Sequence, residues 1–122
     1  MSDPKKVLIL DDEEDIRELL DMALEEVDCK CIMSSTIKES SSILAREKVD
    51  LVFIDLAVAD GSGVELVQEI VDNYNTPPKM VVYSGYLAVA GDDPVLNKID
   101  ALIEKPCSNE EIVSTVKKLL AS

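Results

Sequence analysis

Charged and hydroxyl side chains come within two residues of the ends of short apolar runs of this sequence. Asp11 and Asp12 follow the first run, Asp55 the third, Ser84 the fourth and Lys105 the fifth. Carboxylates are hard oxygen ligands that suit Mg²⁺, and an aspartate can attack a phosphoryl group to form an acyl phosphate. An ammonium and a hydroxyl can hold the other phosphoryl oxygens. If the fold brings these residues together, the sequence predicts a magnesium-dependent phosphoryl-transfer site.

Each of these residues also has an ordinary structural explanation. Acidic residues such as Asp11 and Asp12 are favoured at the start of a helix. Asp55 could end a strand in solvent, and Ser84 and Lys105 could lie in turns. Their joint occurrence at the ends of four runs, in this order, favours a shared site.

Five apolar runs alternate with segments of helical periodicity, and these elements have to position the candidate site. The runs occupy residues 7–10, 29–33, 51–54, 80–83 and 101–103. They are apolar on both faces, as in a parallel sheet covered by helices. A Ser or Thr followed by Glu three residues later predicts capped helix starts at Thr36, Ser62 and Ser108. The sequence therefore predicts an α/β fold, (βα)5, with a doubly wound five-stranded parallel sheet and ligands beyond the carboxyl ends of its strands.

Composition narrows the function further. The chain has 122 residues, 47% of them hydrophobic, so we expect residues 1–122 to form a single domain. The formal net charge of −13 disfavours binding to nucleic acid or to an anionic membrane. Histidine is absent, which excludes His-based catalysis and His metal ligands. Three cysteines without a C-x-x-C pair predict a cytoplasmic protein, and no apolar run approaches the roughly 18 residues that span a membrane.

The motifs resemble the receiver (response regulator) domain of two-component signalling, of the chemotaxis-regulator type, over residues 5–121. They are Asp11-Asp12-Glu13, Asp55 with Gly63 eight residues later, Ser84-Gly85 and Lys105-Pro106. The resemblance implies a flavodoxin-like sheet with strand order 2-1-3-4-5. It implies a phosphoacceptor domain of a phosphorelay that receives its phosphoryl group from a histidine kinase or histidine phosphotransfer protein. Such a domain catalyses only its own phosphorylation and dephosphorylation, and it signals to a downstream protein that the sequence does not name.

The resemblance also assigns roles to individual residues. Asp55 is the phosphoacceptor, and Lys105 and Ser84 contact the phosphoryl group. The implied cofactor is Mg²⁺, bound by Asp12, Asp55, the backbone carbonyl of Ala57 and, through water, Asp11. A cis peptide bond before Pro106 is implied as well.

Some positions depart from the family pattern. Ala59 stands where the family usually has Pro, and Leu102 stands where an aromatic residue usually precedes the lysine by three. We expect Leu102 to remain packed in the core. Residues 93–94, Asp followed by Pro, predict a short fourth helix that begins late. We therefore expect phosphorylation to be read mainly through residues 84–94 and the short helix after them, with Tyr86 as the movable element.

Three other functions remain as alternatives on the same fold. A phosphohydrolase of the haloacid dehalogenase type would need a D-x-D spacing after the first strand, which Asp11-Asp12-Glu13 lacks. A pseudo-receiver that is never phosphorylated would not need the whole set of acids, hydroxyl and lysine. Dinucleotide or flavin binding would need G-x-G-x-x-G where this chain has acids that repel phosphate.

Overall fold

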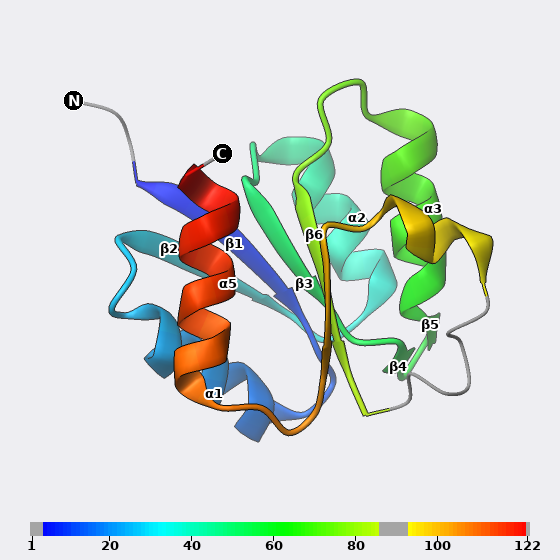
Figure 1. Cartoon of the computed structure of the whole chain (residues 1–122). Coiled ribbons are helices and arrows are strands. Elements are labelled where there is room, and N and C mark those ends of the chain that lie inside the picture. Colours follow the sequence, from blue (N-terminus) through cyan, green and yellow to red (C-terminus); the bar gives the residue numbers. More distant parts are fainter. Residues whose placement is uncertain (1–3, 86–92, 122) are drawn as a thin grey trace.

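A parallel sheet forms the centre of the computed structural model, which describes residues 4–85 and 93–121 (Figure 1). Its strands are β1 (Lys5–Leu10), β2 (Cys29–Ser34), β3 (Leu51–Ile54), β6 (Lys79–Ser84) and β7 (Ala101–Glu104). The order across the sheet is β2-β1-β3-β6-β7, and all four neighbouring pairs are parallel. Counted over these strands alone, this is the order 2-1-3-4-5. The predicted fold class is confirmed.

Helices cover both faces of the sheet. Helices α1 (Glu14–Leu24) and α5 (Asn109–Ala121) lie on one face, and α2 (Ile37–Arg46) and α3 (Gly63–Asn73) lie on the other (Figure 1). The predicted short fourth helix is a five-residue 3-10 helix, η1 (Pro94–Lys98). Asp93 caps this helix, because its carboxylate accepts the Val95 N–H at 3.0 Å.

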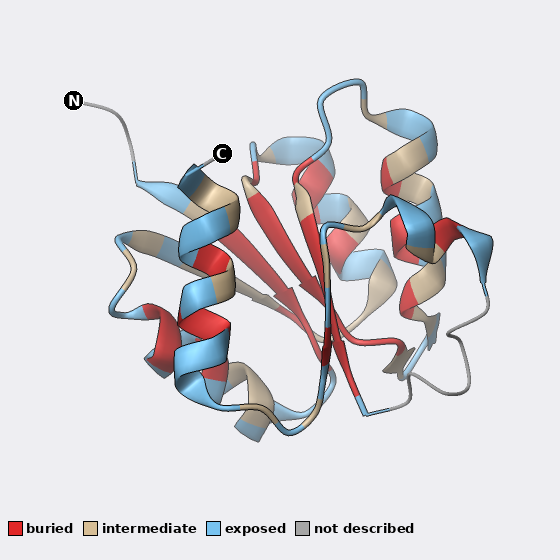
Figure 2. Ribbon diagram, in the orientation of Figure 1, coloured by how far each residue is buried: buried red, intermediate tan, exposed pale blue. Residues whose placement is uncertain are grey.

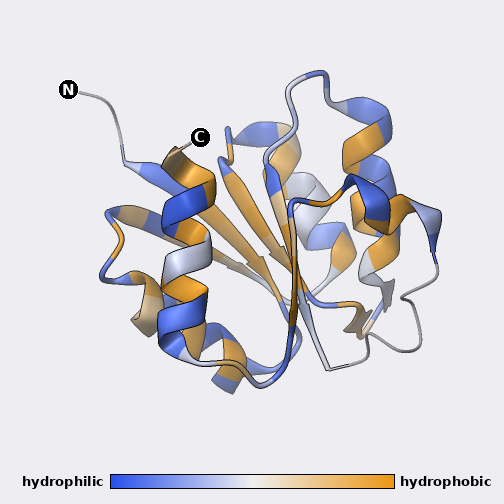
Figure 3. Cartoon of the chain, in the orientation of Figure 1, coloured by the Kyte–Doolittle hydropathy of each residue, from blue (hydrophilic) through white to orange (hydrophobic). Residues whose placement is uncertain are grey.

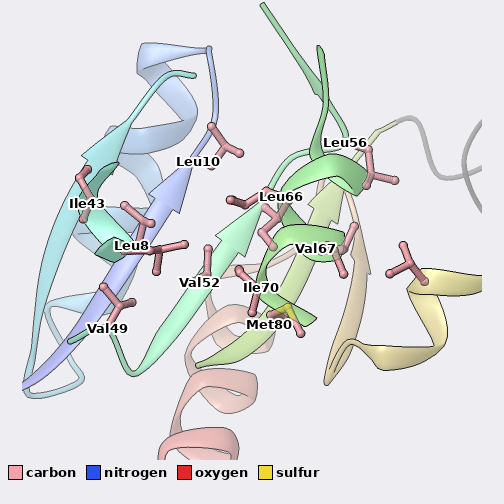
Figure 4. Close-up of a cluster of buried hydrophobic side chains, with 14 residues drawn as sticks. Leu8, Leu10, Ile43, Val49, Val52, Leu56, Leu66, Val67, Ile70 and Met80 are labelled. Carbon is pink, nitrogen blue, oxygen red and sulfur yellow. The ribbon is translucent and has the colours of Figure 1, made fainter. Parts of the chain in front are cut away.

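The strands carry a core on each side because successive side chains of a strand point to opposite faces. Leu8 and Val52 belong to the cluster under α2 and α3 (Figure 4). Their neighbours Ile9 and Phe53 belong to the cluster under α1 and α5. Burial is therefore concentrated in the central strands (Figure 2), which are also the most hydrophobic part of the chain (Figure 3).

The predicted helix caps at the starts of α3 and α5 form. At α3 the cap is a reciprocal capping box, because the Ser62 hydroxyl caps the helix and the Glu65 carboxylate accepts the Ser62 N–H at 2.9 Å. At α2 the Thr36 hydroxyl accepts the Glu39 N–H at 3.1 Å, but the Glu39 carboxylate accepts from Ser35 instead of Thr36. The predicted cap at Thr36 therefore forms, but the Glu39 carboxylate bonds one residue before the cap.

The segment between β3 and α3 contains a small hairpin that the sequence did not predict. It pairs β4 (Ala57–Val58) with β5 (Gly61–Ser62) in antiparallel fashion. Gly61 has a φ of +148°, a backbone conformation that is open to glycine and strained for other residues. Strands of two residues are too short to produce a hydrophobic period.

The expectation that Leu102 is packed in the core is wrong, since the residue is 52% exposed. It lies on β7, an edge strand, where alternate residues face opposite sides of the sheet. Ile103 faces the α1 and α5 side and is buried, whereas Leu102 faces the other side, where η1 is short. Tyr86, the proposed movable element, lies outside the described residues.

Truncating one buried leucine and one exposed leucine should have different effects on the free energy of unfolding. We expect Leu66→Ala, in a residue that is 0% exposed, to lower the free energy of unfolding by about 2–5 kcal/mol. Leu102→Ala is the matched control and should lower it by less than about 1 kcal/mol, because it removes mostly exposed surface. Urea denaturation measures both. Equal losses would show that Leu102 is core after all.

Candidate functional site

A half-buried ammonium joins two buried carboxylates at the carboxyl end of the sheet. Nζ of Lys105 lies 2.6 Å from Oδ2 of Asp11 and 3.3 Å from Oδ2 of Asp55. Asp11 is 1% exposed and Asp55 is 3% exposed, so both carboxylates are removed from water. Burying an ionised carboxylate is costly unless it is paired, and the ammonium supplies that pairing.

The sheet itself places these three residues. The Asp11 amide donates to the Ser34 carbonyl of β2, and the Asp55 amide donates to the Leu10 carbonyl of β1, at 3.1 and 3.0 Å. The Lys105 amide donates to the Ser84 carbonyl of β6 at 3.0 Å. Each charged residue therefore continues the hydrogen bonding of its strand by one bond. The strand register, more than any loop, fixes how far apart the charges lie.

Two exposed acids complete a carboxylate cluster. Asp11, Asp12, Glu13 and Asp55 each offer an oxygen, and the four oxygens lie within 4.8 Å of one another. Asp12 and Glu13 are exposed, whereas the other two are buried. The cluster thus has a closed side, occupied by Lys105, and a side open to solvent. A hard cation with retained water ligands fits such a set of oxygens.

Short-range contacts hold the buried carboxylates in place. Oδ1 of Asp11 accepts the Glu13 N–H at 2.9 Å, and Oδ1 of Asp55 accepts the Ala57 N–H at 3.2 Å. Gly63 packs so closely on this segment that a Cβ there would collide with the Asp55 carbonyl oxygen. A glycine eight residues after Asp55 is therefore required in this chain, because a larger residue at position 63 would collide with the Asp55 backbone.

Burial and pairing shift the protonation of the site in known directions. Burial raises the pKa of the Asp11 carboxyl above its ordinary value, against the hydrogen bond from Lys105. Burial alone would lower the pKa of the Lys105 ammonium. The hydrogen bond to Asp11 and the charges of Asp11 and Asp55 outweigh burial, so this pKa is raised. Lys105 is accordingly a fixed positive charge at neutral pH.

The structure brings most of the predicted residues together. Asp11, Asp12, Asp55 and Lys105 form one group, and Ala57 touches it through its amide. Ser84 is buried at the end of β6, joined to the group by its carbonyl. The peptide bond between Lys105 and Pro106 is cis, as the resemblance implied.

Other residues contribute to the site without a role predicted from sequence. Glu13, the third residue of the first acidic motif, belongs to the oxygen cluster. Arg17 donates from Nη1 to the backbone carbonyl of Asp11 at 2.7 Å. The Lys105 ammonium also lies over the ring of Tyr83. Contacts that a long side chain makes with another element cannot be predicted from the spacing of residues in the sequence.

A family model described as the response regulator receiver domain matches residues 7–117. The chain belongs to this family. Receiver domains are the phosphoacceptor modules of two-component signalling, so the recognition and the class of function inferred from the motifs are confirmed.

Curated relatives agree with this membership. The receiver domain is 41% identical over 87 residues to the response regulator protein PilR of Pseudomonas aeruginosa, covering 70% of this chain and 20% of PilR. It is 29% identical over 123 residues to the phosphate regulon transcriptional regulatory protein PhoB of the same organism, covering 95% of this chain and 52% of PhoB. The chain thus spans about a fifth to about half of the length of these relatives.

Solved structures show the same fold. A response regulator receiver domain protein from Methanospirillum hungatei superimposes with a TM-score of 0.89 at 24% identity, covering 98% of this chain and 95% of that one. The response regulator protein TrrA from Thermotoga maritima, solved in complex with Mg²⁺-BeF, gives 0.85 at 28% identity, covering 94% of this chain and 98% of that one. Among the described residues, no helix combines the length and apolarity needed to cross a membrane.

Removing the ammonium should destabilise this receiver domain in a pH-dependent way. We expect Lys105→Met to lower the free energy of unfolding by about 3 kcal/mol at pH 7, because two buried carboxylates lose their partner. The raised pKa of Asp11 means that its ionisation costs the native state free energy as pH rises through that pKa. Without Lys105 the ionised Asp11 carboxylate destabilises the native state more. At acid pH the carboxyl is protonated and needs no partner, so the difference in unfolding free energy between variant and wild type should shrink.

Urea denaturation at pH 4 to 8, without divalent cations, measures this difference. Lys38→Met is the matched control, because Lys38 is exposed on α2, and it should change stability little at any pH. A loss for Lys105→Met that is small, or the same at both ends of the range, would contradict the pairing.

Proposed function

We propose that Asp55 is the phosphoacceptor of this receiver domain and that Lys105 and Ser84 hold the phosphoryl group. One observation carries the proposal: a buried aspartate at the end of β3 lies 3.3 Å from the half-buried ammonium of Lys105, within a cluster of carboxylate oxygens. The ammonium favours the negative charge that develops on a phosphoryl group during transfer.

The proposed step is a phosphoryl transfer to a carboxylate. An oxygen of Asp55 attacks the phosphorus of a phosphohistidine or of a small acyl phosphate. An O–P bond forms while the donor's P–N or P–O bond breaks, and the donor keeps the electron pair. Lys105 pairs with one phosphoryl oxygen and the Ser84 hydroxyl donates to another. Water later hydrolyses the acyl phosphate and returns the Asp55 carboxylate with inorganic phosphate.

The donor set of the cluster fits Mg²⁺, because it consists of carboxylate oxygens with one side open to solvent. We assign the carboxylates of Asp12 and Asp55 and the Ala57 carbonyl as its ligands, with Asp11 acting through water. When bound, the ion neutralises charge on the phosphoryl oxygens. Asp11 meanwhile keeps Lys105 in place through their 2.6 Å contact.

We propose a sensor histidine kinase or a histidine phosphotransfer protein as the phosphodonor, because the chain contains no histidine of its own. The output is a changed surface for a downstream protein, and the only reaction catalysed is the domain's own phosphorylation and dephosphorylation. The net charge of −13 supports protein partners over nucleic acid or membrane. Residues 1–122 act as a single receiver domain in the cytoplasm.

Incubation with acetyl phosphate and Mg²⁺ tests the phosphoacceptor. The wild-type protein should gain about 80 Da, the mass of one phosphoryl group, and Asp55→Asn should gain nothing because it lacks the nucleophilic carboxylate. Intact-mass spectrometry measures the gain. Asp15→Asn, at an exposed acid in the first turn of α1, is the matched control and should react like wild type. Mass gain by Asp55→Asn at the wild-type rate would disprove the assignment.

Thermal denaturation with and without Mg²⁺ tests whether the ion binds the carboxylate cluster. Mg²⁺ relieves repulsion among the carboxylates of the cluster and binds the native state only, so it should raise the melting temperature. At ten times its dissociation constant the stabilisation is about 1.4 kcal/mol, or about 3–6 °C for a domain of this size. Asp12→Asn should lose most of the shift and Asp15→Asn should keep it. An unchanged wild-type melting temperature at millimolar Mg²⁺ would contradict the metal site.

A further inference from the structure

Tyr83 lies directly beside the site but has no part in the proposed chemistry. It is the penultimate residue of β6, 2% exposed, and faces the core under α1 and α5. The Lys105 ammonium lies over its ring, 5.4 Å from the centroid. Lys105 therefore has three neighbours in the site: two carboxylates and the face of an aromatic ring.

The ring is held from both sides by residues close to the site. It meets Phe53 edge to face, with centroids 6.4 Å apart and planes at 80°. Phe53 precedes Asp55 by two residues on the phosphoacceptor strand. The Tyr83 side chain also lies next to the thiol of Cys107, which follows Lys105 by two residues. Tyr83 thus connects the two segments whose charges have to meet.

We propose that Tyr83 is a positioning residue that holds the Lys105 ammonium within reach of the phosphoryl group on Asp55. This inference rests on the proposed function. A lysine side chain is long and flexible, and its charge is attracted to the negative face of an aromatic ring, most strongly where both are removed from water. The ring is fixed by Phe53 and by the surrounding core, so it presents the same surface before and after transfer.

The ring face, and not the hydroxyl, carries this role. Tyr83→Phe keeps the ring over which the ammonium lies and loses only the contact with Cys107. Tyr83→Leu and Tyr83→Met keep an apolar side chain in the core and lose the ring face. The two kinds of variant therefore separate the attraction of the cation from simple filling of the core.

The rate constant of Asp55 phosphorylation by acetyl phosphate, from intact mass against time at saturating Mg²⁺, tests the inference. We expect Tyr83→Leu and Tyr83→Met to lower it by about twofold to thirtyfold, the range from an exposed to a desolvated cation–π contact. Tyr83→Phe should retain the wild-type rate. Tyr74→Leu, at a ring remote from Lys105 after α3, is the control and should also react normally. Circular dichroism of each variant establishes that it is folded.

The same variants in a Lys105→Met background separate positioning from a general effect on the fold. If Tyr83 acts through Lys105, Tyr83→Leu and Tyr83→Met should lower the rate no further there. An equal further loss in that background, or a wild-type rate for folded Tyr83→Leu and Tyr83→Met, would overturn the role of Tyr83 alone. A wild-type protein that gains no mass would instead overturn the proposed function, and this inference with it.

Discussion

Two carboxylates buried at one edge of a sheet need a positive charge, and this requirement governs the structure. Asp11 and Asp55 come from adjacent strands, β1 and β3, and like charges so close repel. The compensating Lys105 lies 94 residues from Asp11 in sequence. Only a fold that returns the end of β7 to the ends of β1 and β3 can bring it there, and the doubly wound parallel sheet does so. The helices and loops between these strands cover the sheet and connect its strands.

The segment after Asp55 shows how local structure serves the same requirement. The Ala57 amide donates to the carboxylate, the β4–β5 hairpin follows, and α3 begins at a glycine against the Asp55 carbonyl. The capping box at Ser62 and Glu65 then fixes the first turn of that helix. A helix of the outer layer is therefore packed directly on the backbone of the proposed phosphoacceptor.

Much of this could be predicted from sequence because the informative signals are local. Residues 7–10 and 51–54 are apolar throughout, which indicates central parallel strands, and the acids directly after them indicate the edge that carries the chemistry. The strand order came from the resemblance and not from periodicity. Leu102 was misplaced because an apolar residue on an edge strand is buried only if something covers it, and the length of η1 decides that. The contact between Tyr83 and Lys105 was not predicted either, since it joins neighbouring strands through side-chain directions that spacing does not encode.

The amides of Asp11, Asp55 and Lys105 each complete a strand's hydrogen bonding, and this has a consequence for folding fidelity. A slip of one residue between two strands moves a side chain by about 3.3 Å and turns it to the opposite face of the sheet. In this chain such a slip would bury a carboxylate without its ammonium, or an ammonium without its carboxylates, at a cost of several kcal/mol. An apolar sheet tolerates misalignment more readily, because one aliphatic neighbour substitutes for another. The charges at this edge thus specify the strand register. The same groups that equip the domain for signalling also raise the free energy of misfolded alternatives.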